Sequence, residues 1–230
     1  MSATPHPRSR SRRRSLARRF VAPIAITALL ASGCVSAGKQ HPRFSAVAPA
    51  VRTVAVVPFR YAAEMKDGQI DSAGAARVAE SVRRSAAMHL LQRQQAGELT
   101  ITLQSVEETN DRIVEAGLTP AATVDMPAEE LAGVLGVDAV LRGSITAYDV
   151  PDPATEVVRG AASFLVGGLV GALLAPDGGK LACSFAVHKA RTGTVLWTLD
   201  QSFRAGAFKG PDAMLAQSGS WMASHFPFRR

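Results

Sequence analysis

The side chains that most often do chemistry are present in this chain, but their spacing matches none of the familiar reaction sites. The histidines beyond the N-terminal segment are scattered: His41, His89, His188 and His225. No two of them stand at the spacing of metal ligands, and no pair of cysteines could complete a zinc site. Asp177 to Lys180 contains the Gly-Lys of a phosphate-binding loop, but Leu174 replaces its first glycine and Leu181 its serine or threonine. We therefore expect no metal, no cofactor and no enzymatic activity.

The N-terminal segment accounts for the basic character of the chain, whose formal net charge is +7. Its first 33 residues hold seven of the 26 basic residues and no acidic one, so the remainder balances the 19 acidic residues. Nucleic-acid binding relies on an excess of clustered basic side chains in the mature protein. Because the remainder of this chain has no such excess, we expect no nucleic-acid binding. An arginine-rich start followed by an apolar run from Phe20 to Ala31 is typical of a secretion signal. The run has about 12 residues, and a permanent membrane helix needs about 20.

A cysteine follows this signal directly. Leu30-Ala31-Ser32-Gly33-Cys34 resembles the lipobox of bacterial lipoproteins. The resemblance implies cleavage before Cys34, a diacylglyceride on its sulfur and a fatty acid such as palmitate on its amine, which together anchor firmly. Val35 replaces the aspartate of an inner-membrane retention signal, which implies the outer membrane with the protein facing the periplasm. The alternative is an incidental thiol behind a simple secretion signal. Ser11 to Leu16 matches a twin-arginine motif only partly, which leaves the export route open.

Cys183 is the second of two cysteines in the chain. It lies in an alternating run that is typical of a strand. This position favours a buried, inert thiol over a reactive or intermolecular one.

Hydrophobic periodicity predicts an α/β domain with a mixed sheet, in the order β-α-β-α-α-β-(apolar insertion)-β-β-α. Residues 1–33 are the lipoprotein signal peptide, 34–51 a lipidated N-terminus and tether, and 52–230 the periplasmic domain. The tether could reach about 58 Å when fully extended. The expected strands are 53–59, 99–103, 137–148, 181–189 and 194–203. The expected helices are 72–93, with Arg83 and Arg84 facing outward, 105–116, 127–135 and 212–225.

Four short motifs lie within residues 53–202. They are Val57-Pro58-Phe59, Glu108-Thr109 with Ala116-Gly117-Leu118-Thr119, Leu135-Gly136-Val137-Asp138-Ala139-Val140-Leu141, and Arg191-Thr192-Gly193 leading into Leu196-Trp197. Together they resemble a family of bacterial lipoproteins known from a neisserial surface antigen. That family is similar in fold to the curli secretion lipoprotein CsgG, the penicillin-binding-protein activator LpoB and the N-terminal domain of TolB. The resemblance implies an outer-membrane lipoprotein that makes protein contacts, with no known enzymatic activity.

Residues 160–175 form an apolar, Gly/Ala-rich insertion without a single charge. A helix of that length spans about 24 Å, short of the roughly 30 Å of a bilayer core. Three interpretations remain open: a buried segment of the core, a small-residue surface for self-association, or shallow insertion into the nearby leaflet. The candidate residues for the last two are Phe164, Leu165, Val166, Gly167, Gly168, Leu169, Val170 and Gly171.

These features predict a non-enzymatic, lipid-anchored periplasmic protein that works through protein partners in cell-envelope assembly or export. A second copy of the chain is one candidate partner, and nucleic acid is not expected to be one. One alternative is a component of a CsgG-like oligomeric secretion channel. Another is an activator of a peptidoglycan synthase, which the short tether disfavours because the target lies across the cell wall.

Overall fold

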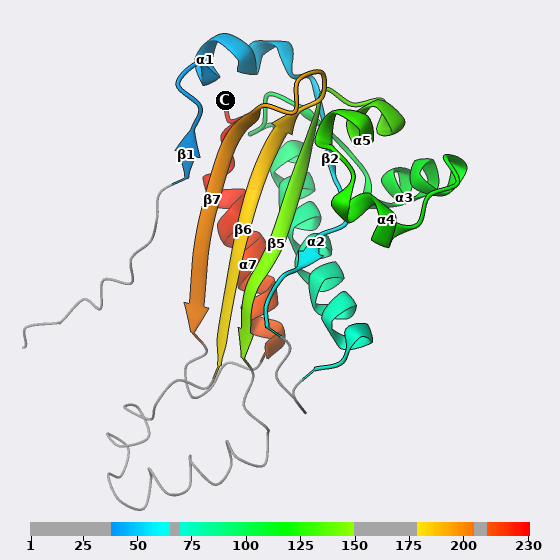
Figure 1. The fold of residues 1–230 in the computed structure, drawn as a ribbon. Helices are drawn as coiled ribbons and strands as arrows, with labels where there is room; N and C mark the ends of the chain where they lie inside the picture. Colours follow the sequence, from blue (N-terminus) through cyan, green and yellow to red (C-terminus); the bar gives the residue numbers. More distant parts are fainter. Residues whose placement is uncertain (1–37, 65–69, 150–178, 205–210) are drawn as a thin grey trace, which may run out of the picture. The chain divides into compact units, whose positions relative to one another are not determined.

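A mixed seven-stranded sheet organises the computed structural model, which describes residues 38–64, 70–149, 179–204 and 211–230 (Figure 1). The strands are β1 Lys39–Gln40, β2 Thr53–Val56, β3 Arg60–Tyr61, β4 Thr102–Gln104, β5 Ala139–Asp149, β6 Lys180–Lys189 and β7 Val195–Arg204. Their order is β1-β7-β6-β5-β2-β4, with β3 beside β5. Strand β2 runs parallel to β4 and β5, whereas β5, β6, β7 and β1 pair antiparallel. The predicted α/β class with a mixed sheet is confirmed.

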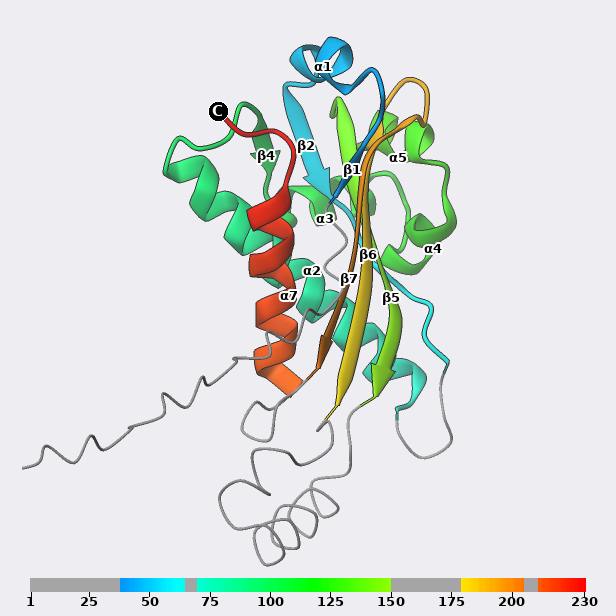
Figure 2. The same cartoon turned by 90° about the vertical axis from the view of Figure 1, so that its left-hand side faces the viewer.

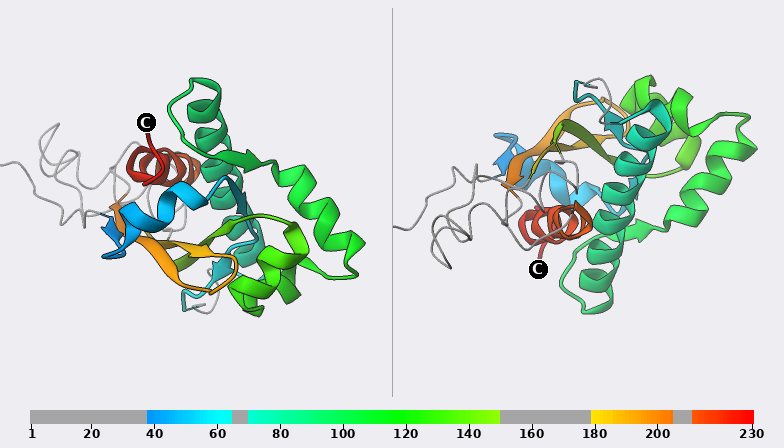
Figure 3. Two further views of the ribbon diagram at one scale, coloured as in Figure 1. Left: turned by 90° about the horizontal axis from the view of Figure 1, so that it is seen from above. Right: turned by 90° about the horizontal axis from the view of Figure 1, so that it is seen from below.

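Helices cover the two faces of this sheet unequally. They are α1 Phe44–Val47, α2 Ser72–Gln95, α3 Val106–Glu115, α4 Pro120–Asp125, α5 Ala128–Leu135 and α7 Pro211–His225, with a 3-10 turn η1 at Ala48–Ala50. Helices α2 and α7 lie side by side on one face of the sheet. Helices α3, α4 and α5 lie on the side of its other face (Figures 2 and 3). None of the helices described is long and apolar enough to cross a membrane.

Helix α2 and helix α7 form the main core together with the sheet. The Asp71 side chain accepts a hydrogen bond from Gly74 N at 2.6 Å and so caps the start of α2. Buried Val82 and Leu90 then point from α2 toward the sheet. Where α7 crosses α2, a Cβ on Gly219 would lie 2.5 Å from the backbone carbon of Ser85. The two backbones can approach this closely only because Gly219 has no side chain.

The ends of the shorter helices follow the sequence signals. Ser105 Oγ accepts from Glu108 N at 3.0 Å, which is one of the two hydrogen bonds of a capping box. The Glu108 carboxylate turns instead to Arg112 Nη2, at 2.8 Å. Helix α5 ends at Gly136 in the left-handed conformation, with φ of +64°. Helix α4 was not among the expected helices, although Thr119 caps it by accepting from Ala122 N at 3.2 Å.

The N-terminal segment is docked where the sequence predicts a free tether. Lys39 and Gln40 pair with β7, and a Cβ on Gly38 would lie 2.4 Å from Trp197 Nε1. Phe44 is 9% exposed, with its ring centroid 5.3 Å from that of Phe228. The tether prediction therefore fails from residue 38 onward, because these side chains find apolar partners that lie far away in the sequence.

Arg83 also departs from the expectation that it faces solvent. Its side chain is 2% exposed. It donates from Nε to Val56 O at 3.0 Å and from Nη2 to Asn110 Oδ1 at 2.9 Å, and Nη1 lies 3.2 Å from a carboxylate oxygen of Glu80. Because each nitrogen of the guanidinium has an acceptor, the charge is tolerated inside the domain. Arg83 thereby ties α2 to β2 and α3.

Asp138 fastens the start of β2 to the start of β5. Its carboxylate accepts from Arg52 N at 2.8 Å, Thr53 N at 3.0 Å and Thr53 Oγ1 at 3.1 Å. Partial burial works to raise the pKa of Asp138, but these three hydrogen bonds outweigh it and hold the pKa below its usual value.

This pKa shift predicts how stability changes with pH. A depressed pKa in the folded state stabilises the fold fully above the unfolded-state pKa of about 4, and the stabilisation is lost as pH falls through the folded-state pKa. The substitution Asp138→Asn should therefore lower the urea midpoint more at pH 7 than at pH 2.5. Urea unfolding of the variant and the unaltered chain at both pH values measures this change in midpoint. An equal fall of the midpoint at both pH values would contradict the role assigned to the carboxylate.

Candidate functional site

The residues singled out from the sequence for anchoring and membrane or self-contact cannot be placed. Cys34 and the candidates between 164 and 171 lie outside the described residues. Their roles stay predictions. The candidate site in the described part of the chain is a surface that was not predicted from the sequence.

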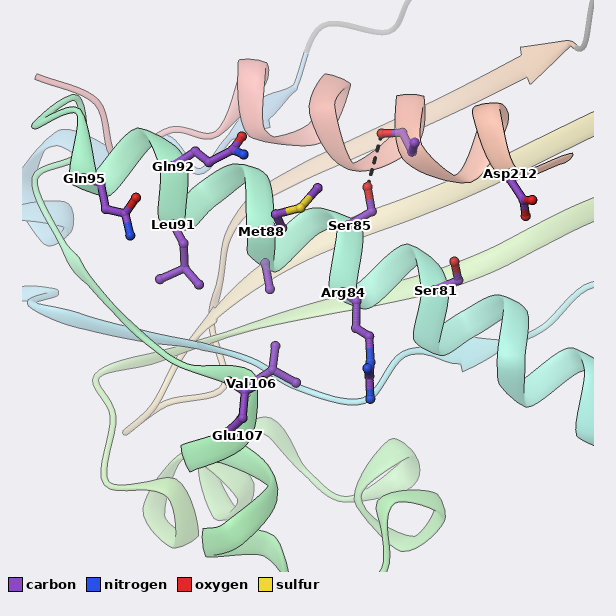
Figure 4. Close-up of a pocket in the computed structure, with 12 residues that line it drawn as sticks. Ser81, Arg84, Ser85, Met88, Leu91, Gln92, Gln95, Val106, Glu107 and Asp212 are labelled. Carbon is purple, nitrogen blue, oxygen red and sulfur yellow. Dashed lines mark hydrogen bonds between the residues drawn. The ribbon is translucent and has the colours of Figure 1, made fainter. Parts of the chain in front are cut away.

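A groove of about 680 Å³ runs along the exposed side of α2, between α3 and α7 (Figure 4). It is lined by Ser81, Arg84, Ser85, Ala87, Met88, Leu91, Gln92, Gln95, Val106, Glu107, Asp212 and Ala216. We call this surface the α2 groove. It joins α2 and α3 to α7, which lies about a hundred residues further along the chain, so its shape depends on the tertiary fold.

The centre of the α2 groove is apolar. Met88 is 49% exposed, an unusual exposure for a large apolar side chain in this fold. Leu91 lies one turn further along α2 and points toward the side on which Val106 begins α3, whereas the Met88 side chain turns toward α7 (Figure 4). Ser85 Oγ donates to Ala216 O at 3.2 Å, which fixes α7 against α2 beside the groove (Figure 4).

Charged groups border this apolar centre. Arg84 pairs with Glu80 across one helical turn, with Nε 2.7 Å from a carboxylate oxygen. That hydrogen bond raises the pKa of Arg84, and the Glu107 carboxylate adds to the effect. Glu107 on α3 and Asp212 on α7 are exposed carboxylates on either side of α2 (Figure 4). The groove thus combines an apolar centre with acidic borders.

The polar residues that line the groove are serines, glutamines, one arginine and two carboxylates. None of the lining residues within the described part of the chain is a histidine or cysteine. The described residues also contain no group of three or more side chains that could hold a metal ion. The scattered histidines make separate local contacts: His89 Nδ1 lies 3.2 Å from Gln92 Oε1, and His188 Nδ1 lies 3.2 Å from Gly193 O. An apolar surface with charged borders is instead suited to binding another molecule.

Cys183 lies in β6 with its side chain turned into the core. It is 2% exposed, and burial raises the pKa of its thiol to about 12. The expectation of a buried thiol is confirmed. The thiolate, which is the reactive form, is therefore scarce at neutral pH.

We expect Cys183 of a Cys34→Ser variant, in which it is the one cysteine of the sequence, to show no reaction with a disulfide reagent such as DTNB at pH 8 over minutes in the native state, and to react after unfolding in urea. The physical reason is that both burial and the raised pKa must be removed before Cys183 can attack. Absorbance of the released thiolate measures this directly. Rapid reaction of Cys183 in the native state would contradict its placement.

Comparisons with known proteins give structural likenesses only. No family model matches the chain, and no curated protein matches its sequence. The lipoprotein GNA1162 from Neisseria meningitidis is similar at a TM-score of 0.46 and 16% identity, over 75% of this chain and 96% of that one. The dodecameric PelC from Paraburkholderia phytofirmans is similar at a TM-score of 0.43 and 15% identity, over 76% of this chain and 88% of that one. The LpoB C-terminal domain from Escherichia coli is similar at a TM-score of 0.34 and 13% identity, over 70% of this chain and 93% of that one.

The sequence motifs resemble a family known from a neisserial surface antigen and similar in fold to LpoB, and a neisserial lipoprotein and LpoB are both among these structural likenesses. At these TM-scores and identities, the likenesses carry no conclusion about what this chain binds or does.

One signal in the sequence could have pointed to the groove. Met88 and Leu91 stand three residues apart, so they lie on one side of a helix. Met88 is outside the stripe that faces the sheet, which includes Val82 and Leu90. A second apolar stripe on a helix predicts a second surface to cover.

Proposed function

We propose that this chain is a non-enzymatic lipoprotein, anchored through Cys34 in the periplasmic leaflet of the outer membrane, that acts through protein contacts in envelope assembly or export. The anchor rests on the lipobox-like segment behind an arginine-rich secretion signal. The structural observation that supports protein contact is the α2 groove, with Met88 at its exposed centre.

Pairing of the N-terminal segment with β7 supports a site of action close to the membrane. Lys39 is the first residue paired with β7, and only residues 35–38 separate it from Cys34. At no more than about 3.6 Å per residue, this stretch reaches about 18 Å. A lipidated Cys34 would hold the β1–β7 edge within that distance of the leaflet. This short reach weighs against activation of a synthase on the far side of the cell wall.

The charges around the α2 groove define the kind of partner. Arg84 already has Glu80 as a counter-ion, whereas Glu107 and Asp212 are exposed carboxylates. A partner segment with an apolar side chain for Met88 and basic residues on its flanks would match this surface. We therefore propose an amphipathic, basic-flanked segment of an envelope protein as the occupant.

Site-specific photo-crosslinking in cells tests this proposal. A photoreactive residue in place of Met88 should give a discrete crosslinked product from the membrane fraction. Val114 provides the control, because it is 68% exposed and apolar but does not line the groove. The product at position 88 should weaken when Glu107 and Asp212 are both replaced by lysine. No product at position 88, or the same products at 88 and 114, would contradict the proposal.

The secretion-channel alternative makes a different prediction. It requires rings of the lipidated chain that conduct ions across a bilayer. Native electrophoresis and conductance measurements on the purified protein test it, and the absence of both properties would remove it.

A further inference from the structure

A second, polar pocket of about 260 Å³ lies on the side of the sheet opposite α2 and α7, next to α4. Its lining includes Arg60 from β3, Arg142 and Ser144 from β5, and Ser184 from β6. The strand register brings them together, because Ser144 is paired with Arg60 on one side and with Ser184 on the other. Figure 1 looks onto β5 and β6 from this side. Two guanidinium groups and two hydroxyl groups therefore meet in one small concave surface.

Both arginines also hold the end of α4. Arg142 Nη2 donates to Met126 O, and Arg60 Nη2 pairs with the carboxylate of Asp125. This structural role leaves one donor without a partner. Arg142 Nε is buried and has no hydrogen-bond acceptor among the described residues. An unpaired, buried N–H of a charged group is costly, and Arg142 is one of the residues that line this pocket, so the group would gain from an acceptor supplied by another molecule.

The surrounding charges show how such an acceptor would be held. Burial lowers the pKa of Arg142, and the charge of Arg60 lowers it further. The carboxylates of Glu129 and Asp125 act in the opposite direction. Because these charges nearly balance, attraction at long range is weak. Binding would depend on direct hydrogen bonds inside the pocket, and these are strong when donor and acceptor are both charged.

We propose that this pocket binds an oxyanion group, a carboxylate or a phosphate, between the guanidinium groups of Arg60 and Arg142. The oxyanion accepts from Arg142 Nε, with the Ser144 and Ser184 hydroxyls as further donors. It takes the place of Asp125 on Arg60. Asp125 is the natural competitor, because its side chain is 78% exposed and can move away into solvent. The pocket is separate from the α2 groove, so this proposal stands apart from the proposed function.

Nuclear magnetic resonance on the full chain in detergent micelles, labelled with ¹⁵N-arginine, tests the site directly. Acetate, inorganic phosphate and chloride are added separately at matched ionic strength. The Arg142 Nε–H resonance should move saturably with acetate or with phosphate, and the anion that saturates at lower concentration identifies the class of ligand. No saturation with either oxyanion, or the same shifts with chloride, would overturn the proposal.

Three variants separate binding from stability. Arg142→Gln, followed through the Arg60 Nε–H resonance because its own arginine signal is lost, should weaken oxyanion binding by about tenfold or more. Asp125→Asn should tighten it, because the competing charge is gone while the fold keeps its α4 contacts. A gain of affinity cannot come from misfolding, so an unchanged or weaker affinity in Asp125→Asn would refute the competition. Arg84→Gln is the matched control and should bind as the unaltered chain does, since Arg84 lies in the α2 groove.

Discussion

Replacing Arg83 by alanine should destabilise the domain by about 3–5 kcal/mol, the cost typical of removing one partner from a buried charged network. The substitution would leave Val56 O and the Asn110 side chain without the donors that they have at 3.0 and 2.9 Å. It would also leave a cavity between α2, β2 and α3. Urea unfolding followed by circular dichroism measures the loss.

Arg84 supplies the matched control for Arg83. It is the next residue on the same helix and pairs with the same Glu80, but its side chain is 70% exposed. Surface ion pairs of this kind contribute little to stability. Arg84→Ala should therefore unfold at nearly the same urea concentration as the unaltered chain. Equal losses in the two variants would show that the interior network of Arg83 does not hold these elements together.

Gly219→Ala should cost about 1–3 kcal/mol, because a Cβ there overpacks the crossing of α2 and α7. The new atom would lie 2.5 Å from Ser85 C and 2.6 Å from Ala86 N, and backbone atoms cannot rotate away. Alanine is the better helix former by about 1 kcal/mol, so the net loss is smaller than the clash itself. The helices must separate, which would also strain the Ser85–Ala216 hydrogen bond beside the α2 groove.

Gly133 tests the same substitution where there is room. It lies in α5, and a Cβ there meets nothing within 4 Å. Gly133→Ala should therefore stabilise the domain by about 0.5–1 kcal/mol. Thermal unfolding of the two alanine variants should give shifts of opposite sign. A loss of stability in both would indicate that helix crossing is not the cause.

Local signals in the sequence predicted most of the fold. The glycine that ends α5 and the serine that caps α3 act through neighbouring backbone groups, so their effect is visible within a few residues. The six-residue helix α4 is too short to show periodicity, and only its threonine cap and the following proline indicate it.

The features that were missed depend on distant contacts. Phe44 falls within the expected tether, but its ring packs against that of Phe228. Arg83 was expected to face solvent, but Val56 and Asn110 provide it with buried acceptors. The α2 groove needs α2, α3 and α7 together. Sequence periodicity reports which side of a helix is apolar, but not which elements will lie beside it.

We propose that lipid on Cys34 holds this domain beside the outer membrane. Intact mass spectrometry of the protein extracted from native membranes tests it most directly. We expect a chain that begins at Cys34 and carries the added mass of a diacylglyceride and a fatty acid. A chain with an unmodified thiol at residue 34, recovered from the soluble periplasmic fraction, would contradict it.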